Sequence, residues 1–394
     1  MRVVLFEHPS FLDSKSMPRF AGMLAQACAE MGHEVQRWAP RPVLQPLFAG
    51  TRLGKWAGYV DQYLLFPRWV RRQLRQALPG TLYVFADQAL GPWVPLVQHL
   101  PHVVHVHDLL ALRSALGLVP ENPTGWTGRI YQRYIRRGFR RGRRFICISG
   151  RTQSDLVAFG GIDAAKTEVV LNDLNHAFRP LGRDAAVQAL NARGLALPEQ
   201  GCLVHISGGQ WYKNFAGVLG LYAEYASRHE QPLPLCLIGP FTDADLARSL
   251  KPLPPQAQVR ILSGVDARTL EQVYSAAQVL IFPSHAEGFG WPILEAQAAG
   301  CPVITTDDAP MNEIAGPEAR YVPRLMAGSD AQAWCRAGAD QLDDLLRADE
   351  PERASRSAAC VQWASGFAQG RALQRYLAIY QEVMAAPAGA GDER

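Results

Sequence analysis

The sequence predicts an α/β protein built from two Rossmann-like, doubly wound parallel sheets that face a central cleft. Two observations carry this prediction. At 394 residues the chain is longer than one hydrophobic core usually organises. Short apolar strands alternate with amphipathic helices, and this alternation restarts once near the middle of the chain. Strands that alternate with helices form parallel sheets through right-handed crossovers, so two such runs predict two domains of this kind.

The first half opens with Arg2–Phe6, a short apolar run suited to a parallel strand that is buried on both faces. Pro18 is expected to begin a helix that ends near Gly32, because proline is favoured in the first turn and glycine stops helices. The further elements expected here are strands at 34–39, 81–86, 103–106, 145–149 and 169–171, a basic amphipathic stretch at 63–78, an arginine-rich helix, and a helix opened by Ser149 or Thr152.

The polar stretch at 179–201 is predicted to be the linker between the halves. The second half is expected to contain strands at 202–206, 234–238, 259–262, 279–282 and 302–305, and helices at 216–228, 267–277 and 291–299. A last helix is predicted at 367–384 from apolar residues at helical spacing. The small and polar residues after it, 385–394, are expected to be disordered.

Charge and cysteine content narrow the function classes. The net charge of +4 is too modest to indicate nucleic-acid binding, and no aromatic platform lies beside the arginine-rich segment from Arg129 to Arg144. That segment is either a solvated helix or one that contacts anionic lipid headgroups. Seven scattered cysteines without a Cys-x-x-Cys pair suit a reducing cytosol. We expect no signal peptide and no membrane-spanning segment, so the predicted location is cytoplasmic.

The segment from Phe282 to Gly300 carries the most informative pattern. A strand ends, a loop brings Glu287 and two glycines, and a helix opens near Pro292. Glycine lets the backbone approach a ligand, and a helix N-terminus offers free amides and positive potential to phosphate. Glu295 lies near the start of that helix, at the same mouth as Glu287. Two carboxylates beside a phosphate site are suited to the hydroxyls and the diphosphate of a nucleotide sugar.

Glu287 and Glu295 stand within Glu-Gly-Phe-Gly-Trp-Pro-Ile-Leu-Glu, which resembles the E-x7-E motif of retaining GT-B glycosyltransferases, notably glycosyltransferase family 4. Segments 208–214, 263–266 and 309–316, and in the first half 32–35, 104–109 and 147–149, resemble further family segments in the same order. The resemblance implies a GT-B fold: an acceptor-side domain at 1–180, a donor domain at 181–366, and a segment at 367–394 whose helix crosses back to the first domain.

The resemblance also implies a role for each matching residue. Lys213 would pair with the donor diphosphate, and Glu295 would hydrogen-bond the ribose hydroxyls. Glu287 would orient the sugar hydroxyls and His107 would contact the sugar near the reacting carbon, so these two are the expected catalytic residues. The other expected donor-binding residues are Gly208, Gly209, Asn214, Gly264, Val265, Gly288, Phe289 and Gly290, and the acceptor-side candidates are Ser14, Lys15 and Asp108.

In this family the leaving nucleoside diphosphate helps to deprotonate the acceptor on the same face of the sugar. The resemblance therefore implies hexosyl transfer from a UDP- or GDP-sugar with retention, with no cofactor and no metal ion. The implied acceptor is a glycan or a polyprenyl-linked precursor in surface polysaccharide biosynthesis. An enzyme that uses such an acceptor would work at the cytoplasmic face of the inner membrane, with the segment from Arg129 to Arg144 near the lipid.

The sequence departs from the family pattern at two places. Many relatives carry an arginine five residues before the lysine, where this chain has Gly208. The diphosphate charge is then expected to be met by backbone amides or by another residue. The first domain also lacks the usual Gly-Gly loop after its first strand and has residues 11–18 instead. Two alternatives stay open: a non-catalytic nucleotide-sugar binding or scaffold protein, and a nucleotide-sugar epimerase of the same fold.

Two possible metal motifs have simpler readings. Asp243-Ala-Asp245 resembles the D-x-D motif of a different glycosyltransferase fold, but after Thr242 it is predicted to cap a helix. His105 and His107 share one face of a strand, and no third ligand at metal-binding spacing accompanies them. We therefore predict no metal site.

Overall fold

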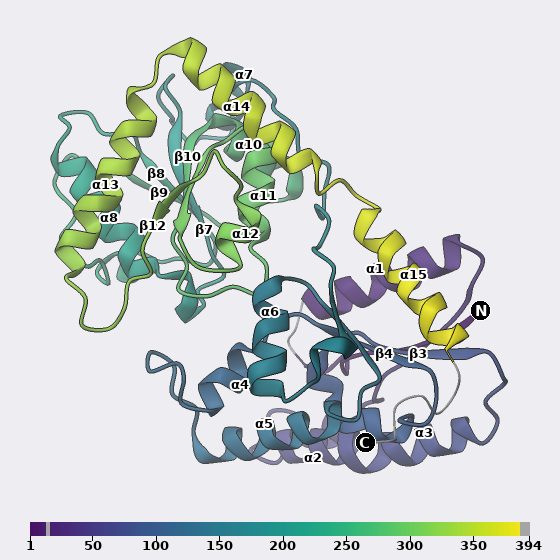
Figure 1. The fold of residues 1–394 in the computed structure, drawn as a ribbon. Helices are drawn as coiled ribbons and strands as arrows, with labels where there is room; N and C mark the ends of the chain where they lie inside the picture. The colour runs from purple at the N-terminus through teal and green to yellow at the C-terminus, as the bar shows by residue number, and fades with distance from the viewer. Residues whose placement is uncertain (13–15, 387–394) are drawn as a thin grey trace. The chain divides into compact units, whose positions relative to one another are not determined.

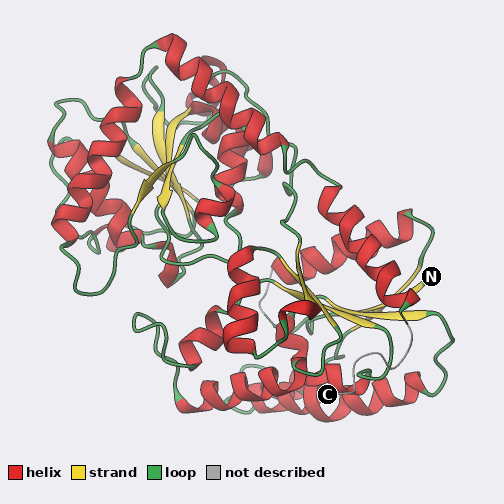
Figure 2. Cartoon of the chain, in the orientation of Figure 1, coloured by secondary structure: helices red, strands yellow, loops and turns green. Residues whose placement is uncertain are grey.

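The structure, a computed structural model, describes residues 1–12 and 16–386. The chain divides into two compact units (Figure 1). Unit 1 comprises residues 1–119, 123–171 and 370–394, and unit 2 comprises residues 120–122 and 172–369. Each unit contains one six-stranded parallel sheet between layers of helices (Figure 2). The predicted fold class is confirmed in both halves.

The sheet of unit 1 has the strand order β2-β1-β3-β4-β5-β6, and every neighbouring pair is parallel. Its strands are β1 Arg2–Phe6, β2 Glu34–Trp38, β3 Thr81–Phe85, β4 His102–Val106, β5 Arg144–Cys147 and β6 Thr167–Val169. Its helices are α1 Ser16–Glu30, α2 Gly54–Val60, α3 Phe66–Leu74, α4 Leu110–Ala115, α5 Trp126–Phe139, α6 Gly150–Asp155 and α15 Arg371–Ala385, with a 3-10 segment at Gln88–Leu96. Apolar side chains from β1, β3 and β4 alternate between two cores, as parallel strands covered on both faces require.

The last helix of the chain, α15, belongs to unit 1. Tyr376, Leu377, Ile379 and Tyr380 on its buried face pack with Phe20 of α1 against one side of the sheet. Helices α3 and α5 and the 3-10 segment cover the other side. One face of the sheet in unit 1 is thus covered in part by a helix that lies more than 200 residues after β6 in the sequence.

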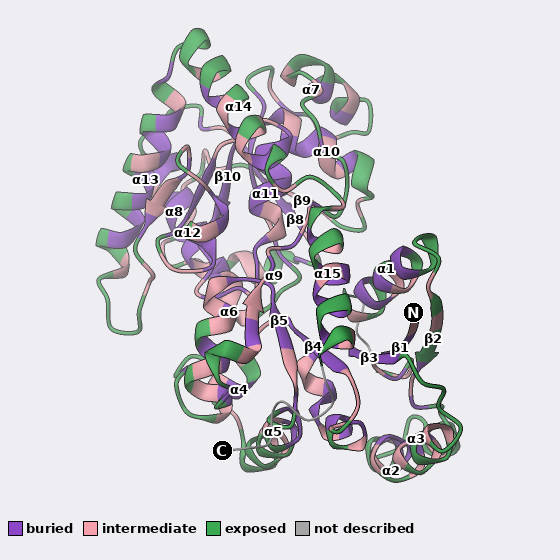
Figure 3. Ribbon diagram, turned by 45° about the vertical axis from the view of Figure 1, so that its right-hand side comes forward, coloured by how far each residue is buried: buried purple, intermediate pink, exposed green. Residues whose placement is uncertain are grey.

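The sheet of unit 2 has the order β12-β11-β10-β7-β8-β9, again with parallel neighbours. Its strands are β7 Cys202–Ile206, β8 Leu235–Ile238, β9 Val259–Leu262, β10 Ala277–Phe282, β11 Val303–Thr306 and β12 Arg320–Val322. Its helices are α7 Arg183–Asn191, α8 Phe215–Ser227, α9 Asp243–Leu246, α10 Ala267–Ala276, α11 Trp291–Ala298, α12 Met311–Ile314, α13 Ala331–Arg347 and α14 Glu350–Ser365. Figure 3 shows buried strands inside each unit and helices that expose one side to solvent.

The structure differs from the sequence-based expectations in several places, among them the last helix, predicted at 367–384 and observed as α15 Arg371–Ala385. The predicted linker at 179–201 contains a helix, α7, which buries Ala186, Val187 and Leu190 on one face. The apolar stripe of this helix is short and is flanked by glycines and polar residues, so the sequence pattern does not indicate a helix there. The arginine-rich helix ends at Phe139, and Arg144 already belongs to β5. Unit 2 begins at Asn172, earlier than the predicted boundary at 181.

Candidate functional site

The topology of unit 2 marks one edge of its sheet as the place for a ligand. Strand β7 lies between β10 and β8, so the chain switches direction across the sheet at β7. In doubly wound sheets, ligands bind outside the carboxyl ends of the strands at such a switch point. The predicted donor-binding residues follow β7, β9 and β10 at this edge, in the loops at 207–214, 263–266 and 283–290 and at the start of α11.

Lys213 and Glu287 form the central ion pair of this edge. Lys213 Nζ lies 2.8 Å from Glu287 Oε1, and the two side chains are only 12% and 8% exposed. The ammonium group also lies 4.5 Å from the centre of the Phe282 ring, which favours a cation there. The pair therefore places an ammonium group at the carboxyl ends of β7 and β10 and neutralises it with the Glu287 carboxylate.

Asn214 fixes the direction in which Lys213 leaves the loop. It adopts a left-handed backbone conformation with φ 51° and ψ 43°, which asparagine tolerates better than most residues. Its side-chain oxygen accepts a hydrogen bond from Gly217 N at 3.2 Å and so caps α8. Its amide nitrogen donates to Pro283 O at 3.0 Å. Asn214 thus ties the loop after β7 to the loop after β10, a structural role beside any contact with a ligand.

The loop at 287–290 leads into α11 through glycine. Gly290 has φ 108° and is the N-terminal boundary residue of α11, which has no side-chain cap. Pro292 occupies the first turn, where its missing N–H costs nothing. Within that turn Ile293 N already donates to Gly290 O at 3.0 Å, so the turn offers an anion mainly the positive end of the helix dipole. Phe289 is buried and its ring packs against Trp291, so its contribution at the surface of this loop is backbone.

Glu295 is a buried carboxylate with two donors. Asn175 Nδ2 donates to Oε1 at 2.9 Å, and the hydroxyl of Tyr274 donates to Oε2 at 3.1 Å. Burial raises the pKa of Glu295, and the two hydrogen bonds together with the charge of Lys213 oppose that rise. Each oxygen has accepted one hydrogen bond and retains a lone pair for a further donor. Lys213, Glu287 and Glu295 are thus brought together.

The sequence reasoning missed Asn175 and Tyr274. Asn175 lies 120 residues before Glu295, and no spacing rule links the two. Tyr274 lies on the buried side of α10, where an aromatic residue usually reads as core. A phenol buried at the end of a site helix was the available signal, because a buried hydroxyl generally needs a partner.

The glycines of the remaining loops support tight turns. Gly209 and Gly264 have φ of 82° and 66°, and Gly208 N donates to Gln210 Oε1 at 3.1 Å. The hydroxyl of Ser263 donates to Gly239 O at 2.8 Å and joins the ends of β9 and β8. Gly264 is exposed and Val265 is half-buried. These residues lie at the expected edge of the sheet.

In unit 1, His107 follows β4 and is 7% exposed. Its Nε2 lies 2.9 Å from Ala86 O, and burial lowers its pKa, which favours the neutral imidazole; nearby Asp87 opposes the shift. Asp87 also lies 2.7 Å from His8 Nε2, a pair at the ends of β3 and β1 that the sequence reasoning did not select. The sequence signal for this pair is a histidine two residues after the first strand and an aspartate two residues after the third strand, because both then lie at the carboxyl ends of neighbouring strands.

The acceptor-side candidates have separate outcomes. Asp108 Oδ1 accepts a hydrogen bond from Leu110 N at 3.0 Å, and its carbonyl oxygen accepts one from Gln88 at 2.6 Å. Ser14 and Lys15 lie outside the described residues. Asp108 therefore shapes the turn after β4, and the acceptor role of all three stays a prediction.

The two possible metal motifs take structural roles. Thr242 and Asp245 form a capping box at the start of α9, which confirms the predicted helix cap. His105 is fully buried, and its Nε2 lies 2.6 Å from the hydroxyl of Tyr380.

All seven cysteines are buried and unpaired, as small core residues are expected to be. Within residues 1–12 and 16–386, no helix is long and apolar enough to cross a bilayer.

Two family models match this chain. Residues 193–356 match the model described as glycosyl transferases group 1, and residues 17–177 match that of glycosyltransferase family 4. A D-inositol 3-phosphate glycosyltransferase of Salinispora tropica is 30% identical over 244 residues, which cover 59% of this chain and 49% of that protein. O-antigen chain mannosyltransferase B of Escherichia coli is 31% identical over 119 residues, 30% of this chain and 31% of that protein. The chain spans about half the length, or less, of these curated relatives.

Solved structures resemble the chain over nearly all of its length. Sucrose-phosphate synthase from Thermosynechococcus elongatus has a TM-score of 0.68 at 18% identity and covers 98% of this chain and 100% of its own. Anabaena HepE in complex with UDP and glucose has a TM-score of 0.66 at 16% identity, over 97% of this chain and 99% of its own. At these identities the likeness shows the fold alone.

Proposed function

Because the chain belongs to the group 1 glycosyltransferases of GT-B fold, we propose that it transfers a sugar from a nucleotide sugar bound by unit 2. The observation that carries this proposal is the Lys213–Glu287 ion pair beside the open N-terminus of α11. A diphosphate brings concentrated negative charge, which an ammonium group and the positive end of a helix dipole stabilise. Once Lys213 turns to the diphosphate, Glu287 is released to accept hydrogen bonds from sugar hydroxyls.

Glu295 is proposed to bind the ribose. Its two oxygens are aimed by Asn175 and Tyr274, and each retains acceptor capacity for one ribose hydroxyl. Its burial supports recognition, because a hydroxyl that fails to meet a buried carboxylate leaves an unpaired charge. UDP and GDP share the ribose diphosphate, so both are candidate donors. The binding of UDP by Anabaena HepE supports the class of ligand.

The proposed reaction proceeds with retention and without a metal ion or cofactor. The bond from the anomeric carbon to the diphosphate oxygen breaks, and the acceptor oxygen forms its bond on the same face. The acceptor proton passes to the leaving diphosphate. Lys213 and the positive end of the α11 dipole are proposed to stabilise the charge that develops on the leaving diphosphate oxygen, and His107 is proposed to contact the sugar beside the reacting carbon. Its lowered pKa suits a neutral hydrogen-bonding group.

We propose that the acceptor is a glycan or a polyprenyl-linked precursor of a surface polysaccharide, at the cytoplasmic face of the inner membrane. The E. coli relative named as an O-antigen chain mannosyltransferase supports this class. The relatives named as D-inositol 3-phosphate glycosyltransferases make a phosphorylated polyol the competing acceptor. Both acceptors are assayed with the same donor, and the product's anomeric configuration, read by NMR, tests retention.

The donor site is tested by calorimetric titration of UDP, GDP and ADP into the wild type, Lys213→Ala and Glu295→Ala. We expect one diphosphate to bind selectively. Each substitution should weaken that binding by roughly 1.5–3 kcal/mol, about 10- to 150-fold, because each removes a charge-assisted contact. Lys251→Ala, which removes an unrelated lysine paired with Glu224, is the matched control. Normal binding by both site variants would refute the assignment.

One feature favours a second candidate, a nucleotide-sugar binding protein without transferase activity. Gly208 occupies the place of an arginine and offers no positive side chain to the diphosphate. Binding of a nucleotide sugar without transfer to any acceptor and without hydrolysis would establish this candidate. Release of the free diphosphate with time, followed by coupled assay, would exclude it.

A further inference from the structure

A cationic cavity lies in unit 2 at the edge of the sheet opposite to the Lys213–Glu287 pair. It encloses about 110 Å³. Its walls come from the start of α7, the end of α10, the first residues of β10, the turn before β11, and α14. Residues 277 and 302 lie at the amino ends of β10 and β11, whereas the Lys213 pair lies beyond their carboxyl ends. The cavity is therefore separate from the proposed nucleotide site.

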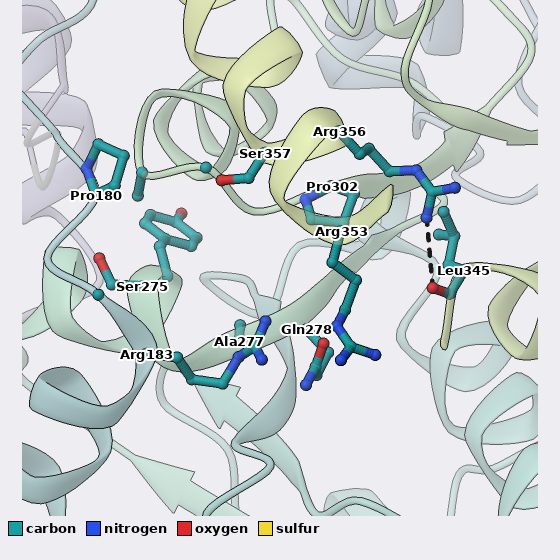
Figure 4. A pocket seen from close by; sticks show the side chains of 14 residues that line it. Pro180, Arg183, Ser275, Ala277, Gln278, Pro302, Leu345, Arg353, Arg356 and Ser357 are labelled. Atoms are coloured by element: carbon teal, nitrogen blue, oxygen red, sulfur yellow. Dashed lines mark hydrogen bonds between the residues drawn. The ribbon is translucent and has the colours of Figure 1, made fainter. Parts of the chain in front are cut away.

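Three arginines line this cavity, Arg183, Arg353 and Arg356, and the guanidinium of Arg356 is directed toward Leu345 (Figure 4). Figure 4 shows the side chains of Arg183 and Arg353 directed toward Gln278 from two sides. No carboxylate is among the lining residues within the part of the chain that the structure describes. Glu350 and Glu352, which pair with Arg353 and Arg356, are 74% and 58% exposed and so face solvent.

The arginines are held in place by the fold. Arg356 is 8% exposed and donates to Leu345 O at 3.4 Å (Figure 4). Arg353 donates to Ala348 O at 2.6 Å. The Nε of Arg183 is buried and makes no hydrogen bond. Gly300 has φ 79°, and a side chain there would collide with Ser357 Oγ, so this glycine lets α14 approach the turn before β11.

We propose that this cavity binds the phosphoryl group of inorganic phosphate or of a small phosphorylated metabolite. Glu350 and Glu352 neutralise Arg353 and Arg356 from the solvent side, so the charge of Arg183 and its unsatisfied Nε are what an anion in the cavity would meet. Guanidinium groups present paired N–H donors that match phosphate oxygens, and the unsatisfied Nε of Arg183 supplies one such donor. A volume of this size suits a phosphoryl group and is well below the several hundred Å³ of typical whole-ligand sites.

The test is calorimetric titration of sodium phosphate and of glucose 6-phosphate at ionic strength held constant with sodium chloride. The wild type should bind one equivalent. Arg183→Gln and Arg353→Gln should each weaken binding about tenfold, since each removes a charged donor. Arg336→Gln, at an exposed arginine elsewhere on α13, should bind as the wild type does. Circular dichroism checks that each variant is folded, and Arg353→Lys should recover part of the affinity.

Two further comparisons identify the chemical source of the phosphoryl group and distinguish this cavity from the proposed nucleotide site. Preference for phosphate or for glucose 6-phosphate tells whether the free ion or a phosphorylated metabolite is the ligand. Lys213→Ala should bind phosphate normally, because Lys213 belongs to the other edge of the sheet. Loss of phosphate binding in that variant, unchanged binding in both arginine variants, or no binding beyond that of chloride would each overturn the proposal. UDP binding by the arginine variants separately reports on the nucleotide site.

Discussion

Glu295 joins stability and recognition in a single side chain. It is 5% exposed, and burial raises its pKa above the ordinary value of 4.5. The folded protein therefore binds a proton at Glu295 more tightly than the unfolded chain does. The stability that this tighter proton binding contributes is fully present below pH 4.5, and it decreases as the pH rises through the raised pKa of Glu295. At neutral pH this carboxylate costs stability, which is expected of a group kept for binding.

Glu295→Gln should remove this pH dependence. The amide keeps the shape of the side chain, and the Tyr274 hydroxyl can reverse to accept from it. We expect the decrease in melting temperature between about pH 4.5 and pH 7 to be smaller in the variant, while nucleotide affinity falls. Thermal unfolding across this range measures the first effect. Glu224→Gln is the control: the hydrogen bond from Lys251 lowers the pKa of the Glu224 carboxyl, so its pH-dependent stability is lost below pH 4.5 and the slope between pH 4.5 and pH 7 should stay as in the wild type. Parallel curves for wild type and Glu295→Gln would contradict the expectation.

At the scale of the element, α5 has two different faces. Ile135, Gly138 and Phe139 are buried against the 3-10 segment at Gln88–Leu96, and a side chain at Gly138 would collide with the backbone of Gly91. On its exposed side, Trp126 and Ile130 are 74% and 53% exposed. A surface hollow beside them is lined by Arg133, Arg136, Arg137, Arg140 and Arg141. Exposed apolar groups beside arginines suit the interface of an anionic bilayer.

Arg133→Gln/Arg137→Gln should reduce binding to vesicles that contain phosphatidylglycerol. Each arginine near an anionic surface is worth about 1 kcal/mol, so the double variant should lose about 2 kcal/mol, roughly 30-fold in affinity. Co-sedimentation with vesicles at low and high salt measures the effect. Arg248→Gln/Arg347→Gln changes the net charge equally at exposed sites of unit 2 and serves as the control. Equal losses in both double variants would show a non-specific charge effect.

The elements also show what a sequence can and cannot predict. Strands such as Arg2–Phe6 and Cys202–Ile206 were found at their observed bounds, because they are buried apolar runs flanked by polar residues. The sequence predicts a linker where α7 forms, because only one short face of this helix is buried. Lys213, Glu287 and Glu295 are predicted from the resemblance to family motifs, and the structure brings them to one end of the sheet, while their binding roles stay predictions. Their partners Asn175 and Phe282 are not predicted, since contacts between distant loops are decided by packing.

At the scale of the whole molecule, the chain leaves unit 1 at Leu171 and returns to it at Gly370. Unit 1 therefore depends on a helix made after all of unit 2. Tyr376 and Tyr380 of α15 are 1% exposed, and Tyr380 meets His105 in the interior of the unit. Unit 2 has its own core, built on α8, α13 and its sheet. The two units should thus differ in their need for the C-terminus.

Truncation after Gln369 should unfold unit 1 and leave nucleotide binding by unit 2. Six residues of α15 are buried, and the five larger ones, at about 1.5–3 kcal/mol each, amount to as much as the whole stability of a typical domain, about 5–15 kcal/mol. Limited proteolysis with and without UDP measures which unit is cleaved. In the full chain, Tyr376→Ala/Tyr380→Ala should act in the same direction, and Gln374→Ala/Gln381→Ala at exposed positions should not. Protection of unit 1 in the truncated chain would refute its dependence on α15.

Tyr274 has one further consequence. Tyr274 lines the cavity that also contains Arg183, and its hydroxyl donates a hydrogen bond to Glu295. A single side chain therefore borders both proposed ligand sites. Thermodynamic reciprocity then applies: whatever factor phosphate imposes on nucleotide affinity, the nucleotide must impose on phosphate affinity. A phenol that belongs to two sites makes each ligand a reporter of the other. If both proposed ligands bind, a Tyr274→Phe variant should change the nucleotide affinity measured with and without phosphate by the same factor as the phosphate affinity measured with and without nucleotide.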